Sequence, residues 1–450
     1  MKIQQAYRLP MGFIFAAFLN FTVGAILGGT MAADPALSYR LAPIHAILNP
    51  YGWLTLLIYG MTFAVLALSL GVQLPVSSQG WAQLVVAEAG VVLLVIGNLI
   101  QSTWPSRTGV VLLVLAPMLF LYNILSGVRY TKRLSRSQES GIKDVLTQLP
   151  TSAEAAIQLF GRVPAYRKTD AVGQRGTDVS LMLFIIATVW TAIWNWNDPK
   201  GSGLIYSQGL EWLTFYGWIG GTTLSVALHL APRFLRRPAD PAGWWSVLQV
   251  GWFGGVLLSV VGSWIGVPWE RAGSIVTGIA LVGSALGFLW LAVVRRSHSR
   301  TGEEASVAAS STVLNSNTST RGLHGPGIAA WIIGWLFALV LGYELVTYGD
   351  PFALSSIHLL FLGFITSLVY AVGYTAFPII LGRRPPHTSL AYVQLICSEI
   401  GAMLLIGSFM RIEAGHATSL MLMSGGVLAT VGVLMFLALW GLRQPSSRVK

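Results

Sequence analysis

Long apolar runs alternate with short polar segments along almost the whole chain. A helix rises about 1.5 Å per residue, so about twenty apolar residues cross the ~30 Å hydrocarbon core of a bilayer. The sequence therefore predicts an all-α polytopic membrane protein with about twelve transmembrane helices. We place them at 11–31, 43–70, 81–101, 109–129, 179–196, 207–232, 244–265, 273–295, 327–347, 354–381, 388–409 and 417–441.

Two longer polar stretches divide these helices into three groups of four. The groups occupy residues 1–130, 179–296 and 327–450, and they are separated by a polar loop at 131–178 and a linker at 297–326. The linker has a Ser/Thr/Asn-rich core, a composition typical of flexible connections. Neither stretch predicts a separate domain.

Short motifs recur in the same order in each group, which predicts an internal four-helix repeat. Asp-Pro follows the first helix of each group, and a glycine followed by an aromatic residue lies in each second helix. Any single match is also explained by the apolar and glycine-rich composition that membrane helices have in common. That composition explains poorly why several matches occur in the same order. The matching pairs are Asp34-Pro35, Asp198-Pro199 and Asp350-Pro351, and then Gly52-Trp53, Gly217-Trp218 and Gly363-Phe364.

Composition and charge agree with a membrane location. The chain is 54% hydrophobic and 10% charged, whereas soluble domains are about 25% charged. All but five of its 28 Lys and Arg residues fall in alternate loops, which predicts cytoplasmic N- and C-termini by the positive-inside rule. This topology, with attraction to lipid headgroups, accounts for the net charge of +11, so we expect the lipid bilayer and no nucleic acid as a partner. We expect the first apolar run, which follows Lys2 and Arg8, to be a retained helix and not a cleaved signal peptide.

Two of the seven histidines, His45 and His358, lie a few residues inside the outer end of the second predicted helix of their groups. An ionisable group in a membrane span is costly and is first interpreted as functional. The alternative is a histidine that is hydrogen-bonded across helices. We expect His298, His324 and His387 to be solvated and His229 to lie at the interface, and we leave His416 open.

Two neutral imidazoles at similar depth on different helices suit the axial positions of one low-spin haem. Haem propionates also need cations at the water boundary, and Arg411 and Arg40 are the candidates on the outer side. The single cysteine, Cys397, excludes a disulfide framework and covalent haem attachment through a CxxCH motif. The sequence thus predicts one haem b with His45 and His358 as iron ligands.

The arrangement resembles subunit I of haem-copper oxidases and nitric oxide reductases, including NnrS-like relatives. That resemblance implies twelve helices in three arcs, with a low-spin haem held by histidines of the second and tenth helices, which match His45 and His358. It also implies an arginine in the last outer loop, matched by Arg411, and a bacterial-type cytoplasmic membrane. The binuclear-centre ligands are missing: Ser356 stands at the high-spin haem position, and His229 lies at the wrong end of the sixth helix. We therefore expect a degenerate member without copper.

Four glutamates also lie in predicted helices: Glu88, Glu211, Glu344 and Glu399. They are possible polar or proton sites, or carboxyls that are hydrogen-bonded within the bundle.

Two main hypotheses follow from these residues. The first is a haem-bearing subunit of a respiratory-type complex, not catalytic by itself, with quinol or a periplasmic cytochrome c or cupredoxin as electron partner. The second is a cofactor-free transporter or assembly scaffold, because repeats and intramembrane carboxylates suit transporters. An enzyme with another type of site ranks last, since no Walker, zincin or nucleophile-elbow spacing is present.

Overall fold

A computed structural model describes residues 8–69, 77–137, 164–197, 208–235, 237–293, 325–380 and 385–441. In these ranges the secondary structure is helical, with no strand. The helices of the first group are α2 (Arg8–Ala33), η1 (Pro35–Leu37), α3 (Ser38–Ile47), η2 (Leu48–Thr55), α4 (Leu56–Ser69), α5 (Ser77–Leu99) and α6 (Thr103–Ser137). Those of the second group are η3 (Pro164–Tyr166), α9 (Arg167–Asn197), α10 (Gln208–Glu211), η4 (Trp212–Gly220), α11 (Gly221–Leu235), α12 (Ala242–Ile265) and α13 (Val267–Val293). Those of the third are α15 (Gly325–Thr347), α16 (Leu354–His358), η5 (Leu359–Ile365), α17 (Thr366–Ile380), α18 (Thr388–Glu413) and α19 (Ser419–Gly441).

Eleven of the described helices are long and apolar enough to cross a membrane, which confirms a polytopic α-helical membrane protein. The predicted sixth span, 207–232, is not among them. It corresponds to the run α10–η4–α11, in which Gly, Thr and aromatic residues replace many of the aliphatic ones. Most residues of this run pack against other helices and not against lipid, so the run does not need a high mean hydropathy.

Helix boundaries differ from the sequence prediction on the side predicted to be cytoplasmic. The stretch 131–178 was expected to be a polar loop, but α6 continues to Ser137 and α9 begins at Arg167. Hydropathy marks only the part of a helix inside the bilayer, whereas polar residues extend both helices beyond it. The Ser/Thr/Asn-rich core of the linker and Asp198-Pro199 lie outside the described residues.

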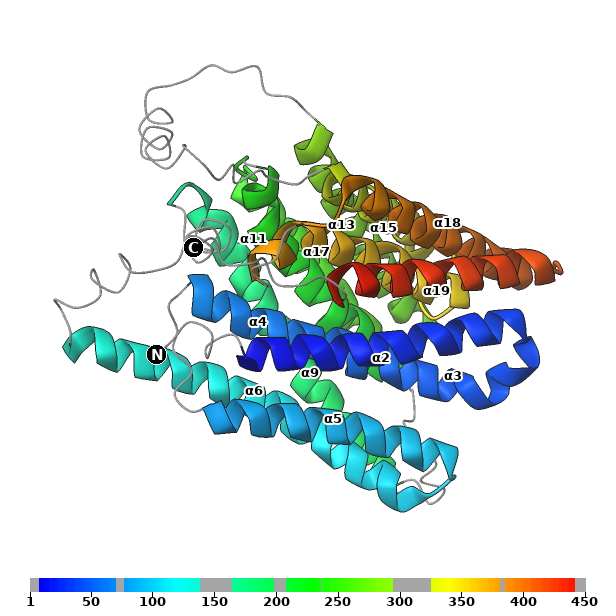
Figure 1. The fold of residues 1–450 in the computed structure, drawn as a ribbon, viewed down its shortest axis with the longest axis horizontal. Coiled ribbons are helices and arrows are strands. Elements are labelled where there is room, and N and C mark those ends of the chain that lie inside the picture. Colours follow the sequence, from blue (N-terminus) through cyan, green and yellow to red (C-terminus); the bar gives the residue numbers. More distant parts are fainter. Residues whose placement is uncertain are drawn as a thin grey trace.

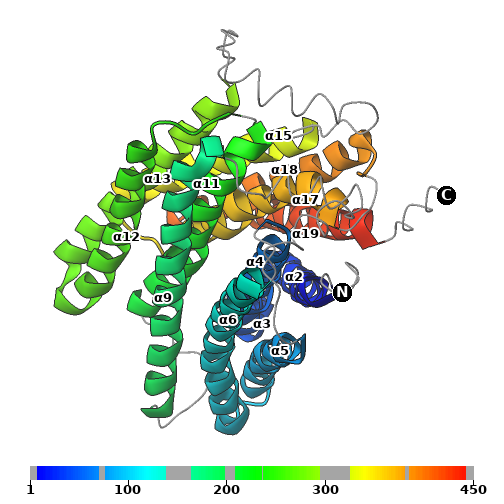
Figure 2. The same cartoon turned by 90° about the vertical axis from the view of Figure 1, so that its left-hand side faces the viewer.

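The helices form a bundle in which the last helix, α19, packs along the first, α2 (Figure 1). Close hairpins are formed by α5 with α6, α12 with α13 and α18 with α19. The second view separates α2–α6, α9–α13 and α15–α19 into three parts of the bundle (Figure 2). Contacts between α6 and α9, and between α13 and α15, join successive parts.

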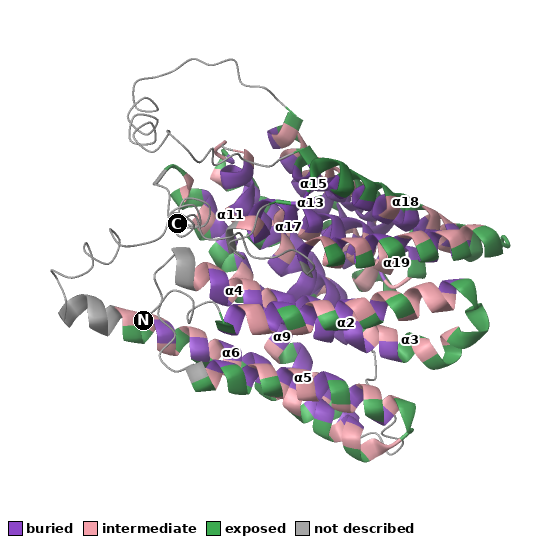
Figure 3. Ribbon diagram, viewed as in Figure 1, coloured by how far each residue is buried: buried purple, intermediate pink, exposed green. Residues whose placement is uncertain are grey.

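The second helix of each predicted group is the most buried one. The runs η2–α4, α10–η4–α11 and α16–η5–α17 lie in the interior, where buried residues concentrate, whereas most residues of α3 are exposed or partly exposed (Figure 3). In the outer hairpins one face is apolar and exposed, for example Val247 and Val250 of α12. An apolar exposed face is what lipid contact requires, so the second helices form the core and the hairpins surround them.

Each second helix contains one π-helical segment, and the π-helical segments of the described chain are these three, η2, η4 and η5. Each segment includes the recurring glycine, which faces the first helix of its own group. A Cβ atom added at Gly52 would lie 2.8 Å from Asn20, at Gly217 3.0 Å from Leu183, and at Gly363 2.7 Å from Phe337. Only a residue without a side chain permits this close approach.

The aromatic residue after the glycine also repeats its packing in two of the groups. Trp53 stacks on Phe21 with ring centroids 3.6 Å apart, and Trp218 stacks on Phe184 at 4.8 Å. The interplanar angles are 9° and 10°. The short motif seen in the sequence therefore corresponds to a repeated helix-helix contact.

Candidate functional site

His45 lies in α3 and points toward the glycine face of α2. Its Nδ1 is 2.9 Å from the carbonyl oxygen of Gly24. A carbonyl oxygen only accepts, so Nδ1 carries the proton and Nε2 has the free lone pair. A Cβ atom at Gly28 would lie 3.0 Å from His45 Cε1, so this glycine provides the space for the ring. Asn49, one turn further on, donates to Nε2 at 3.0 Å.

His358 is the last residue of α16 and has the same tautomer. Its Nδ1 donates to the carbonyl oxygen of Leu354 at 2.7 Å, which again leaves Nε2 with the lone pair. The ring packs against Phe409 of α18, with centroids 4.5 Å apart. Both histidines are only partly buried, and each offers an Nε2 lone pair.

His45 and His358 lie in the second helices of the first and third groups. Their positions in the repeat are similar but differ in register. His45 comes seven residues before Gly52 and His358 five residues before Gly363, a difference of about 3 Å along a helix. Glu211, six residues before Gly217, lies between these two registers.

The predicted cations, Arg40 and Arg411, are both exposed. Arg40 lies in α3, five residues before His45, and Arg411 lies in the last turn of α18, two residues after Phe409. These ends of α3 and α18 are at the same end of the bundle (Figure 1). His416 is exposed in the turn after α18, where its amide donates to the carbonyl of Arg411.

Glu88 and Glu399 each bond a small polar side chain of a neighbouring helix. Asn20 of α2 donates to Glu88 Oε1 and Oε2 at 3.2 and 3.0 Å. The Ser367 hydroxyl lies 2.9 and 3.0 Å from the two oxygens of Glu399. These contacts tie the third helix of a group to its first or second helix, so they serve packing within each group.

Glu344 of α15 is buried and lies beside the turn that carries His358. The hydroxyl of Ser356, the residue at the high-spin haem position of the resembled family, is 2.9 Å from Glu344 Oε2. Glu211 is partly buried at the end of α10. The four glutamates thus have different surroundings, and three of them bond side chains of their own group.

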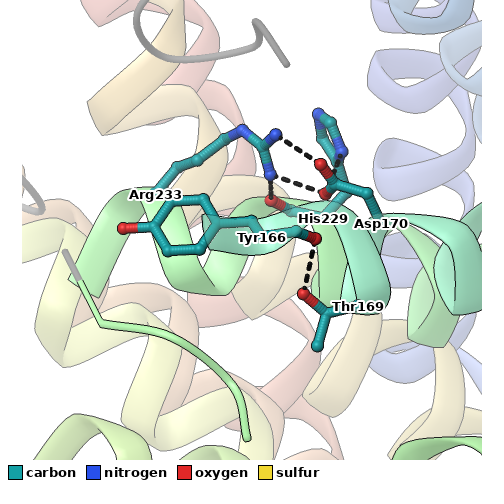
Figure 4. Close-up of polar contacts among 5 residues, drawn as sticks. All are labelled: Tyr166, Thr169, Asp170, His229 and Arg233. Carbon is teal, nitrogen blue, oxygen red and sulfur yellow. Dashed lines mark hydrogen bonds and ion pairs between the residues drawn. The ribbon is translucent and has the colours of Figure 1, made fainter. Parts of the chain in front are cut away.

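A polar cluster between the first turn of α9 and the last turn of α11 was missed by the sequence prediction (Figure 4). Asp170 of α9 accepts from His229 Nδ1 at 2.9 Å and from both terminal nitrogens of Arg233 at 2.8 Å. The Arg233 guanidinium also lies 5.4 Å from the centre of the Tyr166 ring. His229 was expected to be an interfacial residue, and it is only partly exposed. The spacing of His229 and Arg233, four residues on one helix face, was the available signal.

Among known proteins, no family model matches this chain, and no curated protein matches it at a significant level.

Proposed function

We propose that this chain is a haem b-binding integral membrane subunit that transfers electrons or supports an electron-transfer complex. The observation that carries the proposal is the common state of His45 and His358. Each donates its Nδ1 proton to a backbone carbonyl, so its basic nitrogen is Nε2, the atom that can bind iron. A backbone acceptor at Nδ1 is the usual arrangement of a histidine that binds a metal through Nε2.

The surroundings of the pair also suit a haem. Gly24 and Gly28 give α2 a flat face beside His45, and Phe409 provides an apolar surface beside His358. The Asn49 amide now donates to His45 Nε2, so binding of iron at this nitrogen requires the Asn49 side chain to rotate away. A six-coordinate haem held in this way supplies one-electron transfer and leaves no iron position for a substrate.

Arg40 and Arg411 are proposed to bind the propionates, since both are exposed and they lie in the helices that carry His45 and Phe409. A haem near the outer face would exchange electrons with quinol or with a periplasmic cytochrome c or cupredoxin. The outer side follows from the positive-inside rule, which also predicts cytoplasmic termini. The resemblance to the oxidase family adds the expectation of a bacterial-type cytoplasmic membrane.

The three-group repeat supports membership of a degenerate branch of the haem-copper oxidase superfamily. The three π-helical segments, their glycine contacts with the first helix and the two stacked aromatic pairs support that repeat. Asp34 and Asp350 add to it, because each accepts from the amide two residues later, just before a second helix.

The decisive test is a dithionite-reduced minus oxidised spectrum of the detergent-purified protein, with a pyridine haemochrome assay. We expect a sharp α band of low-spin haem b and about one haem per chain. His45→Ala and His358→Ala should each abolish that signal, whereas His416→Ala, an exposed histidine at the same end, should keep it. A folded, haem-free protein would reject the proposal and favour a transporter or an assembly scaffold.

A further inference from the structure

The turn before His358 is held by side chains from several elements. Asp350 accepts from the amides of Phe352 and Ala353 at 3.2 and 3.0 Å. Tyr216 of η4 donates its hydroxyl proton to the carbonyl of Pro351 at 2.9 Å. This turn ends in α16, which contains both His358 and the carbonyl of Leu354 that accepts its Nδ1 proton. The position of the turn therefore sets the direction of the His358 ring.

Helix α18 contacts this turn at two points one helical turn apart. Phe409 packs on the His358 ring, and Glu413 accepts from Ser355. The Ser355 amide donates to Glu413 Oε1 at 3.1 Å and its hydroxyl to Oε2 at 2.7 Å. Residues four apart lie on one helix face, so α18 holds the ring and the start of its helix together.

The buried carboxyl of Glu344 holds the same turn from α15. The Ser356 hydroxyl lies 2.9 Å from Glu344 Oε2 and 2.9 Å from the carbonyl oxygen of Asp350. The Ser356 hydroxyl has one proton, which it donates to one acceptor at a time. Both contacts are hydrogen bonds at the same time when Ser356 donates to the Asp350 carbonyl and a protonated Glu344 donates to Ser356 Oγ. A glutamine at position 344 would donate in the same way.

We infer that Glu344 and Glu413 are positioning residues for His358: they hold Ser356 and Ser355 so that the Leu354 carbonyl fixes the imidazole plane and its Nε2. This inference rests on the proposed function for its haem consequence, but not for the orientation of the ring itself. It gives the intramembrane glutamate of α15 a role that differs from proton conduction or transport. It also explains why a serine is useful where the resembled family has a haem ligand.

The first test uses the haem-free protein, so it does not depend on haem binding. We would measure the rate at which diethyl pyrocarbonate modifies His358 by mass spectrometry, with the exposed His387 as internal reference. Glu344→Ala and Glu413→Ala should each change the rate at His358 about fivefold or more, the factor expected for the loss of one hydrogen bond. Glu344→Gln and Glu413→Gln should restore the rate, because an amide can bond the same serine atoms.

Glu399→Ala is the matched control. It removes a buried carboxyl that also bonds a serine of the third group, Ser367, but that serine is not part of the turn. The rate at His358 should not change in this variant. Equal effects of all three alanine variants would overturn the inference, since they would report a general loosening of the fold. Unchanged rates in Glu344→Ala and Glu413→Ala would overturn it as well.

A second measurement uses the haem-loaded protein. The low-field electron paramagnetic resonance signal of a ferric bis-histidine haem depends on the angle between the two imidazole planes. Glu344→Ala and Glu413→Ala should shift that signal at full haem occupancy, and Glu399→Ala should not. Loaded haem with an unshifted signal would overturn the inference and leave the proposed function intact. A wild-type protein without haem would reject the proposed function, and the modification rates would then decide the inference alone.

Discussion

The ion pair between Asp170 and Arg233 should be a strong link between α9 and α11. At 2.8 Å, two unit charges attract by ~6 kcal/mol for an effective dielectric constant of about 20. Desolvation offsets much of this attraction, and removal of one partner of a fully buried pair costs about 3–5 kcal/mol. The Arg233 side chain is 2% exposed and that of Asp170 is 20% exposed, so the two variants should differ.

Arg233→Ala should lower the free energy of unfolding by ~2 kcal/mol, because Asp170 can be partly rehydrated and keeps its bond with His229. Asp170→Ala should cost ~3–4 kcal/mol, because it removes the carboxylate from a guanidinium that water hardly reaches. The double variant should be no less stable than Asp170→Ala, which gives a coupling energy of about 2 kcal/mol or more.

The measurement is equilibrium unfolding by SDS in mixed micelles, followed by tryptophan fluorescence, for the wild type, both single variants and the double variant. Thr131→Ala is the control, because it changes another polar side chain in the polar extension of a helix, the C-terminal part of α6. Additive effects, with a coupling energy within about 0.5 kcal/mol of zero, would refute the assignment of a strong ion pair. A larger loss in Arg233→Ala than in Asp170→Ala would refute the argument from burial.

Four further variants test other parts of the structure. His45→Met should keep a haem but shift the α band and raise its midpoint potential, as axial methionine does, and an unchanged spectrum would remove His45 from the site. Gly401→Ala should destabilise by ~2 kcal/mol in SDS unfolding, because its Cβ would lie 2.2 Å from the Ala429 amide nitrogen. Gly254→Ala, whose Cβ meets nothing within 4 Å, should be neutral or stabilise by up to ~1 kcal/mol. Trp218→Phe should cost about 1–2 kcal/mol in the same assay, because it leaves the Thr55 hydroxyl without its indole donor, and no loss would contradict the 3.0 Å hydrogen bond.

Individual residues show which structural features of this protein the sequence patterns predicted and which they did not. The glycines of the second helices were visible as a motif, but their close contact with the preceding helix is seen only in the structure. The π-helical segments around them were not predictable, because a single extra residue per turn leaves the apolar pattern of a buried helix unchanged. Asp170 was assigned to a loop because hydropathy detects only the apolar part of a helix.

The amino-acid sequence by itself determined that the chain is a bundle of membrane-spanning helices, because its many long apolar runs are unstable in contact with water and stable in contact with lipid. It also marked His45 and His358, since ionisable residues are rare in such runs. Only the tertiary structure decided which nitrogen each histidine presents, because that depends on the carbonyls of Gly24 and Leu354. Only the tertiary structure also revealed the contacts of Glu344 and Glu413 with the turn before His358 and the ion pair of Asp170 with Arg233. In each case the partners lie on different helices, and no local sequence pattern specifies which helices meet.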